Sequence, residues 1–139
     1  MKQDLFIDTN LICALYNSKD SLYLKAQGIK HLLDIYNPII SNFILLEAYT
    51  VLSQRISKKF SVDFGNNVSK DRIFTVIWID RKLEEEVWDI FASIKDKNFS
   101  YVDASILAVI KKEKISHLLS FDAGFAQLQN NFGFKLIGA

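Results

Sequence analysis

A short apolar run near the start of this chain stops abruptly at three polar side chains. Leu5 to Ile7 is followed at once by Asp8, Thr9 and Asn10, and then by a second apolar segment. This order is typical of a buried strand that ends in a polar turn and leads into a helix. In open parallel sheets, ligands bind beyond the carboxyl ends of the strands. Asp8 is therefore the first candidate for a functional side chain, although an aspartate at this position can also serve only as a helix cap.

Strand-like and helix-like segments alternate along the rest of the chain. Strands are predicted at residues 4–7, 39–41, 73–79, 117–119 and 134–137. Helices are predicted at residues 11–16, 21–36, 42–57, 83–94, 100–112 and 123–129, where apolar side chains recur at helical spacing. Ser21 is expected to cap the second helix, and Pro38 ends its pattern. The polar segment 58–72 fits either a short helix or an ordered loop.

This alternation determines the expected fold class. Strands that alternate with helices imply an α/β fold with a parallel sheet and right-handed crossovers. The 139 residues, half of them hydrophobic, are enough for one domain with a single core. There is no internal repeat, low-complexity tract or linker. We therefore expect a single domain spanning residues 1–139.

Composition restricts the environment in which the chain works. The single cysteine, Cys13, rules out an internal disulfide and favours a reducing compartment. No apolar run approaches the roughly 18 residues that a membrane span needs, and the start lacks the pattern of a secretory signal. We therefore expect a soluble cytoplasmic protein without membrane association. The net charge of +1 neither demands nor excludes a polyanionic partner.

Acidic residues interrupt apolar surroundings at four places along the chain: Asp8, Glu47, Asp103 and Asp122. Each has a structural explanation of its own. Asp8 and Asp122 can cap the helices that follow them. Asp103 can form a capping box with Ser100, and Glu47 can turn its carboxylate toward solvent. Taken singly, none of these acids is better explained by function than by structure.

Taken together, the four acids indicate a metal site. Two follow strands directly and two lie near the beginnings of helices, and a parallel sheet gathers these positions at one edge. Carboxylates that meet in one place raise one another's pKa unless a cation neutralises them. Oxygen ligands without nearby Cys or His favour Mg²⁺ or Mn²⁺ over zinc. His31 and His117 lie in apolar settings, and we assign them ordinary structural roles.

Four segments of the chain together resemble those of PIN-domain ribonucleases, and in particular the VapC-type toxins of toxin–antitoxin pairs. They are Phe6 to Asn10, Ser41 to Glu47, Tyr101 to Ala104, and Leu119 to Asp122. The resemblance implies a three-layer α/β/α sandwich with a mainly parallel sheet of about five strands. It also implies a homodimer and a VapB-like antitoxin whose tail covers the site. Ser120 stands where threonine is more common, which keeps the hydroxyl.

By this resemblance the four acids form a quartet that binds Mg²⁺, with Mn²⁺ as a substitute. Asp8 and Asp103 are expected to be the most direct ligands, while Glu47 and Asp122 shape the site or orient water. Three polar side chains are expected to support the quartet: Thr9, Asn10 and Ser120. The bound ion acidifies water and stabilises charge that develops on phosphate. The expected reaction is hydrolysis of phosphodiester bonds in single-stranded or structured RNA, such as tRNA or rRNA.

Basic residues cluster after two of the predicted helices: Arg55, Lys58 and Lys59, and then Lys111, Lys112 and Lys114. We interpret both clusters as partners of helix dipoles and as solvated charge, because they lie far along their helices from the acids. If one of them gripped phosphates, RNA affinity would fall steeply with salt. Trp78 and Trp88 are assigned to the core or to a dimer interface.

Other functions fit the sequence less well. The chain could be an RNA-processing nuclease outside toxin–antitoxin systems, or a catalytically silent PIN module that binds RNA or protein. Absence of metal binding would favour the silent module. Aspartyl-phosphate chemistry at Asp8 is typical of haloacid-dehalogenase-like enzymes, but these usually carry a second aspartate two residues on. Here that position is Asn10.

Overall fold

A five-stranded sheet lies at the centre of the computed structural model, which describes residues 1–139. The strands are β1 (Asp4–Ile7), β2 (Asn37–Ser41), β3 (Thr75–Ile77), β4 (His117–Leu119) and β5 (Lys135–Ile137). Their order across the sheet is β3-β2-β1-β4-β5, and every neighbouring pair is parallel. The predicted α/β fold with a parallel sheet of about five strands is therefore confirmed.

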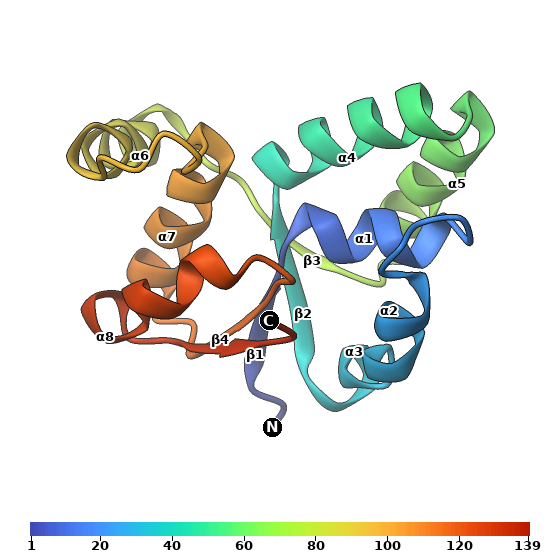
Figure 1. Ribbon diagram of the computed structural model, residues 1–139, viewed down its shortest axis with the longest axis horizontal. Helices are drawn as coiled ribbons and strands as arrows, with labels where there is room; N and C mark the ends of the chain where they lie inside the picture. Colours follow the sequence, from blue (N-terminus) through green and yellow to red (C-terminus); the bar gives the residue numbers. More distant parts are fainter.

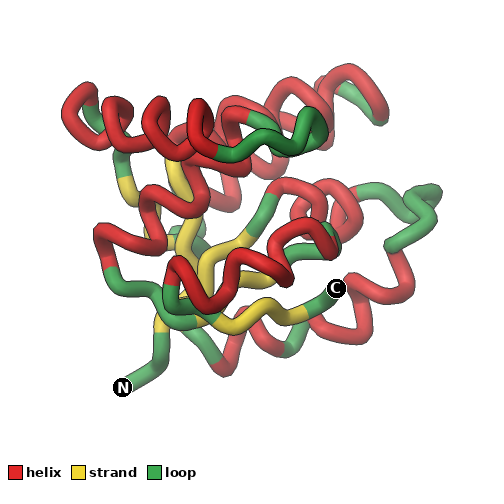
Figure 2. The backbone as a smooth tube through the Cα atoms, turned by 60° about the vertical axis from the view of Figure 1, so that its left-hand side comes forward, coloured by secondary structure: helices red, strands yellow, loops and turns green.

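Helices cover both faces of this sheet. They are α1 (Thr9–Tyr16), α2 (Tyr23–Ile29), α3 (Leu32–Ile35), α4 (Asn42–Arg55), α5 (Lys58–Ser69), α6 (Arg81–Ser93), α7 (Tyr101–Glu113), the 3-10 helix η1 (Ala123–Leu128) and α8 (Gln129–Phe132). The chain runs from β1 outward to β3, and then passes back over β1 to β4 and β5. Because crossovers are right-handed, this reversal puts α1 to α5 on one face and α6 to α8 on the other. Figure 1 shows these two groups, and Figure 2 shows the strands enclosed between them.

The centre of the core is β1 together with α7. Leu5, Phe6 and Ile7 are completely buried, as a central strand covered on both faces requires. In α7, every residue from 104 to 110 is buried. The continuous apolar run at the start of the chain is thus explained by its place in the middle of the sheet. No helix in the structure combines the length and the apolar character that a bilayer span requires.

Several predicted boundaries were wrong. The helix expected at 21–36 is broken into α2 and α3, and Gly28 weakens the last turn of α2. Ser21 does not cap it, because the Leu22 N–H donates to Asp20 Oδ1 at 2.8 Å. The third strand spans only Thr75–Ile77 instead of 73–79, since as an edge strand it pairs with β2 alone.

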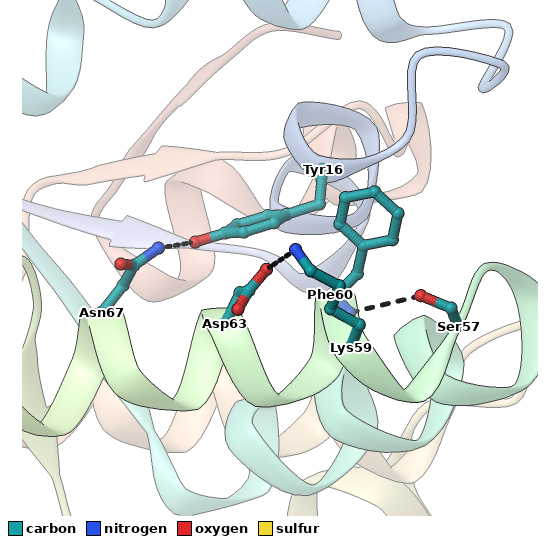
Figure 3. Close-up of polar contacts among 6 residues, drawn as sticks. All are labelled: Tyr16, Ser57, Lys59, Phe60, Asp63 and Asn67. Carbon is teal, nitrogen blue, oxygen red and sulfur yellow. Dashed lines mark hydrogen bonds and ion pairs between the residues drawn. The ribbon is translucent and has the colours of Figure 1, made fainter.

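The segment whose structure the sequence left open is the helix α5, over Lys58–Ser69. Ser57 caps it, with its Oγ accepting from the Phe60 N–H at 3.3 Å (Figure 3). The Asn67 side chain donates to the Tyr16 hydroxyl, which joins α5 to α1. Phe64 is completely buried among aromatic rings. This helix is therefore part of the core on the α1 side of the sheet.

The capping box predicted at the start of α7 is present. The Asp103 N–H donates to Ser100 Oγ at 3.0 Å, and the Ser100 N–H donates to Asp103 Oδ2 at 2.9 Å. Ser100→Ala is expected to lower the free energy of unfolding by about 1 kcal/mol, as loss of a helix N-cap does. Urea denaturation measures this loss. Ser18→Ala, at an exposed loop position, is the control, and equal stabilities of the two variants would contradict the capping role.

Candidate active site

The site lies at the point of the sheet where the strand order reverses. From β1 the chain first adds β2 and β3 on one side, and it then adds β4 and β5 on the other side. Asp8 directly follows β1, and its N–H donates to the Leu119 carbonyl of β4 at 3.0 Å. A crevice opens at such a reversal beyond the carboxyl ends of the strands. In Figure 1 this edge lies between the beginnings of α1, α4 and α7.

A cleft of about 470 Å³ occupies this edge of the sheet. All four acids singled out in the sequence line it, together with Thr9 and Asn10. Each acid comes from a different part of the fold: Asp8 after β1, Glu47 from α4, Asp103 from α7 and Asp122 after β4. Residues separated by as much as 114 positions in the sequence therefore share one cavity.

Asp8 is the most deeply buried member of this group, with 5% of its surface exposed. The Thr9 N–H donates to its Oδ1 at 2.7 Å, and the Ser120 hydroxyl donates to its Oδ2 at 2.7 Å. Burial raises the pKa of this carboxyl from its ordinary 3.8 to about 7, and the charges of Asp103 and Glu47 act in the same direction. Two hydrogen bonds therefore do not compensate for the loss of water around this charge.

The other acids are more accessible. Burial raises the pKa of Asp103, and the nearby Asp122 and Glu47 carboxylates add to this effect. Asp122 is exposed, and its Oδ1 accepts from the Gly124 N–H at 2.8 Å. No hydrogen bond within the chain engages the Glu47 carboxylate, which is half-buried. Glu47, Asp103 and Asp122 each keep at least one oxygen without a hydrogen-bond donor from the chain, and each Asp8 oxygen accepts a single bond and keeps a second lone pair.

A polar network holds the two strand ends together. Ser120 Oγ, which donates to Asp8, accepts from the Asp122 N–H at 3.0 Å and from Asn10 Nδ2 at 3.4 Å. Asn10 Oδ1 accepts in turn from the Phe121 N–H at 3.3 Å. Ser120 is completely buried. Its hydroxyl therefore links the Asp8 carboxylate to the backbone of Asp122.

The donor set fits a hard divalent cation. The cleft presents oxygen atoms, and the carboxylates raise one another's pKa in the absence of a neutralising charge. The buried Thr9 Oγ1 lines the same cleft and has no hydrogen-bond partner, so it is free to bind a further ligand or a water molecule. As the side chains stand, no three of them already form a group that could hold a metal ion. Mg²⁺ commonly keeps several water ligands and needs only one or two direct carboxylates, so the residues present fit this ion without a third acidic ligand.

One interpretation of the basic residues was wrong, and one acidic residue of the cleft was not singled out in the sequence. Arg55 lines the cleft, although the sequence placed its cluster far from the acids. Glu47 and Arg55 lie eight residues apart on α4, so both point to the same side of this helix. Asp20, in the loop after α1, also lines the cleft and was not a candidate in the sequence. Cys13 also borders the cleft, and burial raises the pKa of its thiol to about 11, so this side chain stays uncharged at neutral pH.

Comparison with known proteins identifies the family. The model of the PIN domain matches residues 5–131, which is most of the chain. The chain therefore belongs to the PIN-domain family. In sequence it is 29% identical over 127 residues to the 23S rRNA-specific endonuclease VapC20 of Mycobacterium tuberculosis, covering 88% of this chain and 92% of that protein.

Solved structures support the same assignment. The crystal structure of Mycobacterium tuberculosis VapC20, described as a toxin that cleaves the sarcin–ricin loop, aligns with a TM-score of 0.80 and 25% identity, over 89% of this chain and 94% of VapC20. VapBC2 of Rickettsia felis, bound to promoter DNA, aligns with a TM-score of 0.67 at 16% identity over 96% and 97% of the two chains. The second likeness shows the fold alone.

Proposed function

We propose that this protein is a Mg²⁺-dependent endoribonuclease and the toxin of a VapBC-type toxin–antitoxin pair. The observation that carries this proposal is the convergence of four carboxylates, from four separate parts of the fold, on one cleft at the carboxyl edge of the sheet. Membership of the PIN-domain family and the similarity to an rRNA-cleaving toxin support it. Structured RNA such as rRNA is the proposed substrate class.

Asp8 and Asp103 would bind the ion most directly, because burial has already removed much of the water around both carboxylates. A bound divalent ion supplies positive charge that stabilises the phosphate in the transition state and acidifies water. Ser120 and the Thr9 N–H hold the Asp8 oxygens in place. Glu47, which makes no hydrogen bond within the chain, is free to orient the attacking water. The new bond joins this water oxygen to phosphorus, and the bond to the leaving ribose oxygen breaks.

A homodimer and an antitoxin are the proposed partners. An apolar surface adjoins the cleft, with Leu46 on α4 70% exposed and Trp88 on α6 59% exposed. The rings of Phe43, Tyr101 and Phe91 connect these two residues across α4, α7 and α6. Trp78 and Trp88 are both exposed, so neither belongs to the core. We assign the interface role to Trp88, because it lies beside Phe91 in this apolar surface. Exposed apolar surface of this kind is typical of protein interfaces.

The function is tested by incubating the protein with a mixed RNA pool, once with Mg²⁺ and once with chelator. We expect cleavage at few positions, only with the ion, and loss of cleavage when the proposed VapB-like antitoxin is added. Cleavage without any effect of that protein would favour an RNA-processing nuclease. Metal-independent cleavage, or no cleavage by a protein that binds no ion in calorimetry, would contradict the proposal.

Arg55 is the basic residue expected to contact RNA. It lines the acidic cleft and forms no ion pair, whereas Lys59 on α5 pairs with Asp63 at 3.1 Å and lies outside the cleft (Figure 3). Arg55→Gln should raise KM several-fold and reduce the slope of log affinity against log salt concentration by about 0.7, the value for one phosphate contact with a single strand. Lys59→Gln is the control. Equal salt slopes for both variants would show that Arg55 does not contact phosphate and is only a solvated charge.

A further inference from the structure

A smaller pocket shares two residues with the proposed metal cleft. Asp103 and Asp122 line both cavities. The remaining walls come from the loop between α6 and α7 and from η1, and they include Asp96, Asn98 and Gln127. Neither Arg55 nor Glu47 belongs to it. The pocket therefore lies beside the reacting centre, within reach of a nucleotide that adjoins the phosphate being cleaved.

The pocket combines an apolar wall with free hydrogen-bonding groups. Phe99 and Phe125 meet edge to face, with their ring centroids 6.4 Å apart, and Phe125 is almost completely buried. The side-chain amides of Asn98 and Gln127 form no hydrogen bond within the chain, and both residues are exposed. Asp96 Oδ1 accepts from the Asn98 N–H at 2.9 Å, which orients this carboxylate and leaves its Oδ2 free. These groups are suited to a flat, polar and uncharged ligand.

Charge and size narrow the choice of ligand. Three carboxylates line the pocket, and Asp96 is not among the proposed metal ligands, so its charge repels a phosphate group from this side of the pocket. The pocket is partly open to solvent, and its volume of about 60 Å³ is room for a few water molecules. An edge of a nucleobase fits this space while the rest of the ring stays outside. Single-stranded RNA is commonly recognised in this way, through the Watson–Crick edge of an unstacked base.

We infer that this pocket binds the Watson–Crick edge of a guanine next to the scissile phosphate, an inference that rests on the proposed ribonuclease function. Guanine carries two adjacent N–H donors, which match the Asp96 carboxylate, and a carbonyl oxygen, which matches the amide N–H groups of Asn98 and Gln127. Adenine and cytosine place a ring-nitrogen acceptor where guanine carries its ring N–H. Uracil offers a single N–H between two carbonyls. The pocket thus makes Asp96, Asn98 and Gln127 determinants of the cleavage site.

The inference is tested with short RNAs that carry each of the four bases, or inosine, on either side of one cut. Inosine lacks the exocyclic amine of guanine, and we expect it to lower kcat/KM roughly fivefold for the wild-type protein.

Asp96→Asn should remove the distinction between guanine and inosine. Asn98→Ala combined with Gln127→Ala should lower kcat/KM for the guanine substrate about tenfold. Asn130→Ala, an exposed asparagine on α8 outside the pocket, is the matched control. Cleavage with an unchanged base preference in all variants would overturn the inference and leave the ribonuclease function standing.

A binding measurement decides the same question without catalysis. Isotope-labelled Asp8→Asn protein is titrated with guanosine monophosphate and with adenosine monophosphate, and the side-chain amide signals of Asn98 and Gln127 are followed by NMR. We expect guanosine monophosphate to shift both signals at a lower concentration than adenosine monophosphate. Equal shifts with the two nucleotides, or none at these residues, would overturn the guanine assignment. If the wild-type protein cleaves no RNA but the shifts are seen, the ribonuclease proposal fails and the guanine pocket stands.

Discussion

Asp8→Asn is expected to lower the rate of Mg²⁺-dependent RNA cleavage by roughly 10³-fold while the protein stays folded. An asparagine has almost the same shape and keeps the acceptor for the Thr9 N–H, while the Ser120 hydroxyl, which already accepts two bonds, loses one acceptor. The substitution therefore costs one hydrogen bond and removes the negative charge proposed to bind the ion, without leaving a cavity. Cleavage rates of the purified variant and the wild-type protein, at equal Mg²⁺, measure the effect. A folded Asp8→Asn protein with full activity would remove Asp8 from the metal site.

The same substitution is expected to stabilise the metal-free protein at alkaline pH. Because the pKa of Asp8 is raised from 3.8 to about 7 in the folded state, folding favours the protonated carboxyl. Its contribution to stability is therefore lost progressively as pH rises from about 4 to about 7, by an amount on the order of 4 kcal/mol. In chelator, Asp8→Asn should raise the melting temperature by several degrees at pH 8 and by little at pH 4. Equal changes at both pH values would contradict the raised pKa.

Phe64→Ala is expected to cost about 3 to 5 kcal/mol of stability, a large part of what a domain of this size has. Phe64 is completely buried, with its ring centroid 5.7 Å from those of Tyr16 and Tyr49 and 6.2 Å from that of Phe74. Its removal leaves a cavity between α5, α1 and α4. Urea denaturation of the purified variant measures the loss.

Phe60→Ala is the matched control for this experiment, because it removes the same ring from the same helix. Phe60 is 37% exposed and lies near the start of α5, as Figure 3 shows. We expect its loss to cost less than about 1 kcal/mol. If Phe64→Ala were no more destabilising than Phe60→Ala, α5 would not be the part of the core that the structure describes.

The fold was predictable because its strands and helices differ in length and in hydrophobic period. β1 lies in the middle of a parallel sheet and is therefore apolar on both faces, a pattern visible in Leu5 to Ile7. The helix α5 was not predictable with the same certainty. Its core contact depends on a single fully buried aromatic residue, Phe64, within a polar segment that also contains Gly65 and two asparagines.

The convergence of the four acids on one cleft was predictable from their positions in the sequence, and their structural roles as helix caps are also observed. Asp8 does accept from the next backbone N–H, Asp103 does complete a capping box, and Asp122 does accept from the Gly124 N–H. Capping occupies one oxygen of each carboxylate, and the other remains for different partners. For these residues the structural and functional explanations are compatible, because the carboxyl ends of parallel strands lead directly into the beginnings of helices.

The remaining cleft residues depend on the tertiary structure. Arg55 lies two turns beyond Glu47 on α4, and it lines the same cleft as the acids only because α4 lies along that cleft. Asn98 and Gln127 stand in ordinary polar sequence, and only the packing of the α6–α7 loop against η1 brings them together. The exposure of Trp88 likewise follows from which side of α6 faces the core. The positions of Arg55, Asn98 and Gln127 have no periodic pattern in the sequence.

We propose that the four carboxylates hold a divalent ion in the cleft at the end of β1. Crystals grown with Mn²⁺ test it directly, because this ion scatters anomalously and substitutes for Mg²⁺ at oxygen sites. We expect an anomalous peak within coordination distance of the Asp8 and Asp103 carboxylates. A peak held by other side chains would contradict a metal site formed by these acids. So would the absence of a peak in crystals of a protein that cleaves RNA in the same buffer.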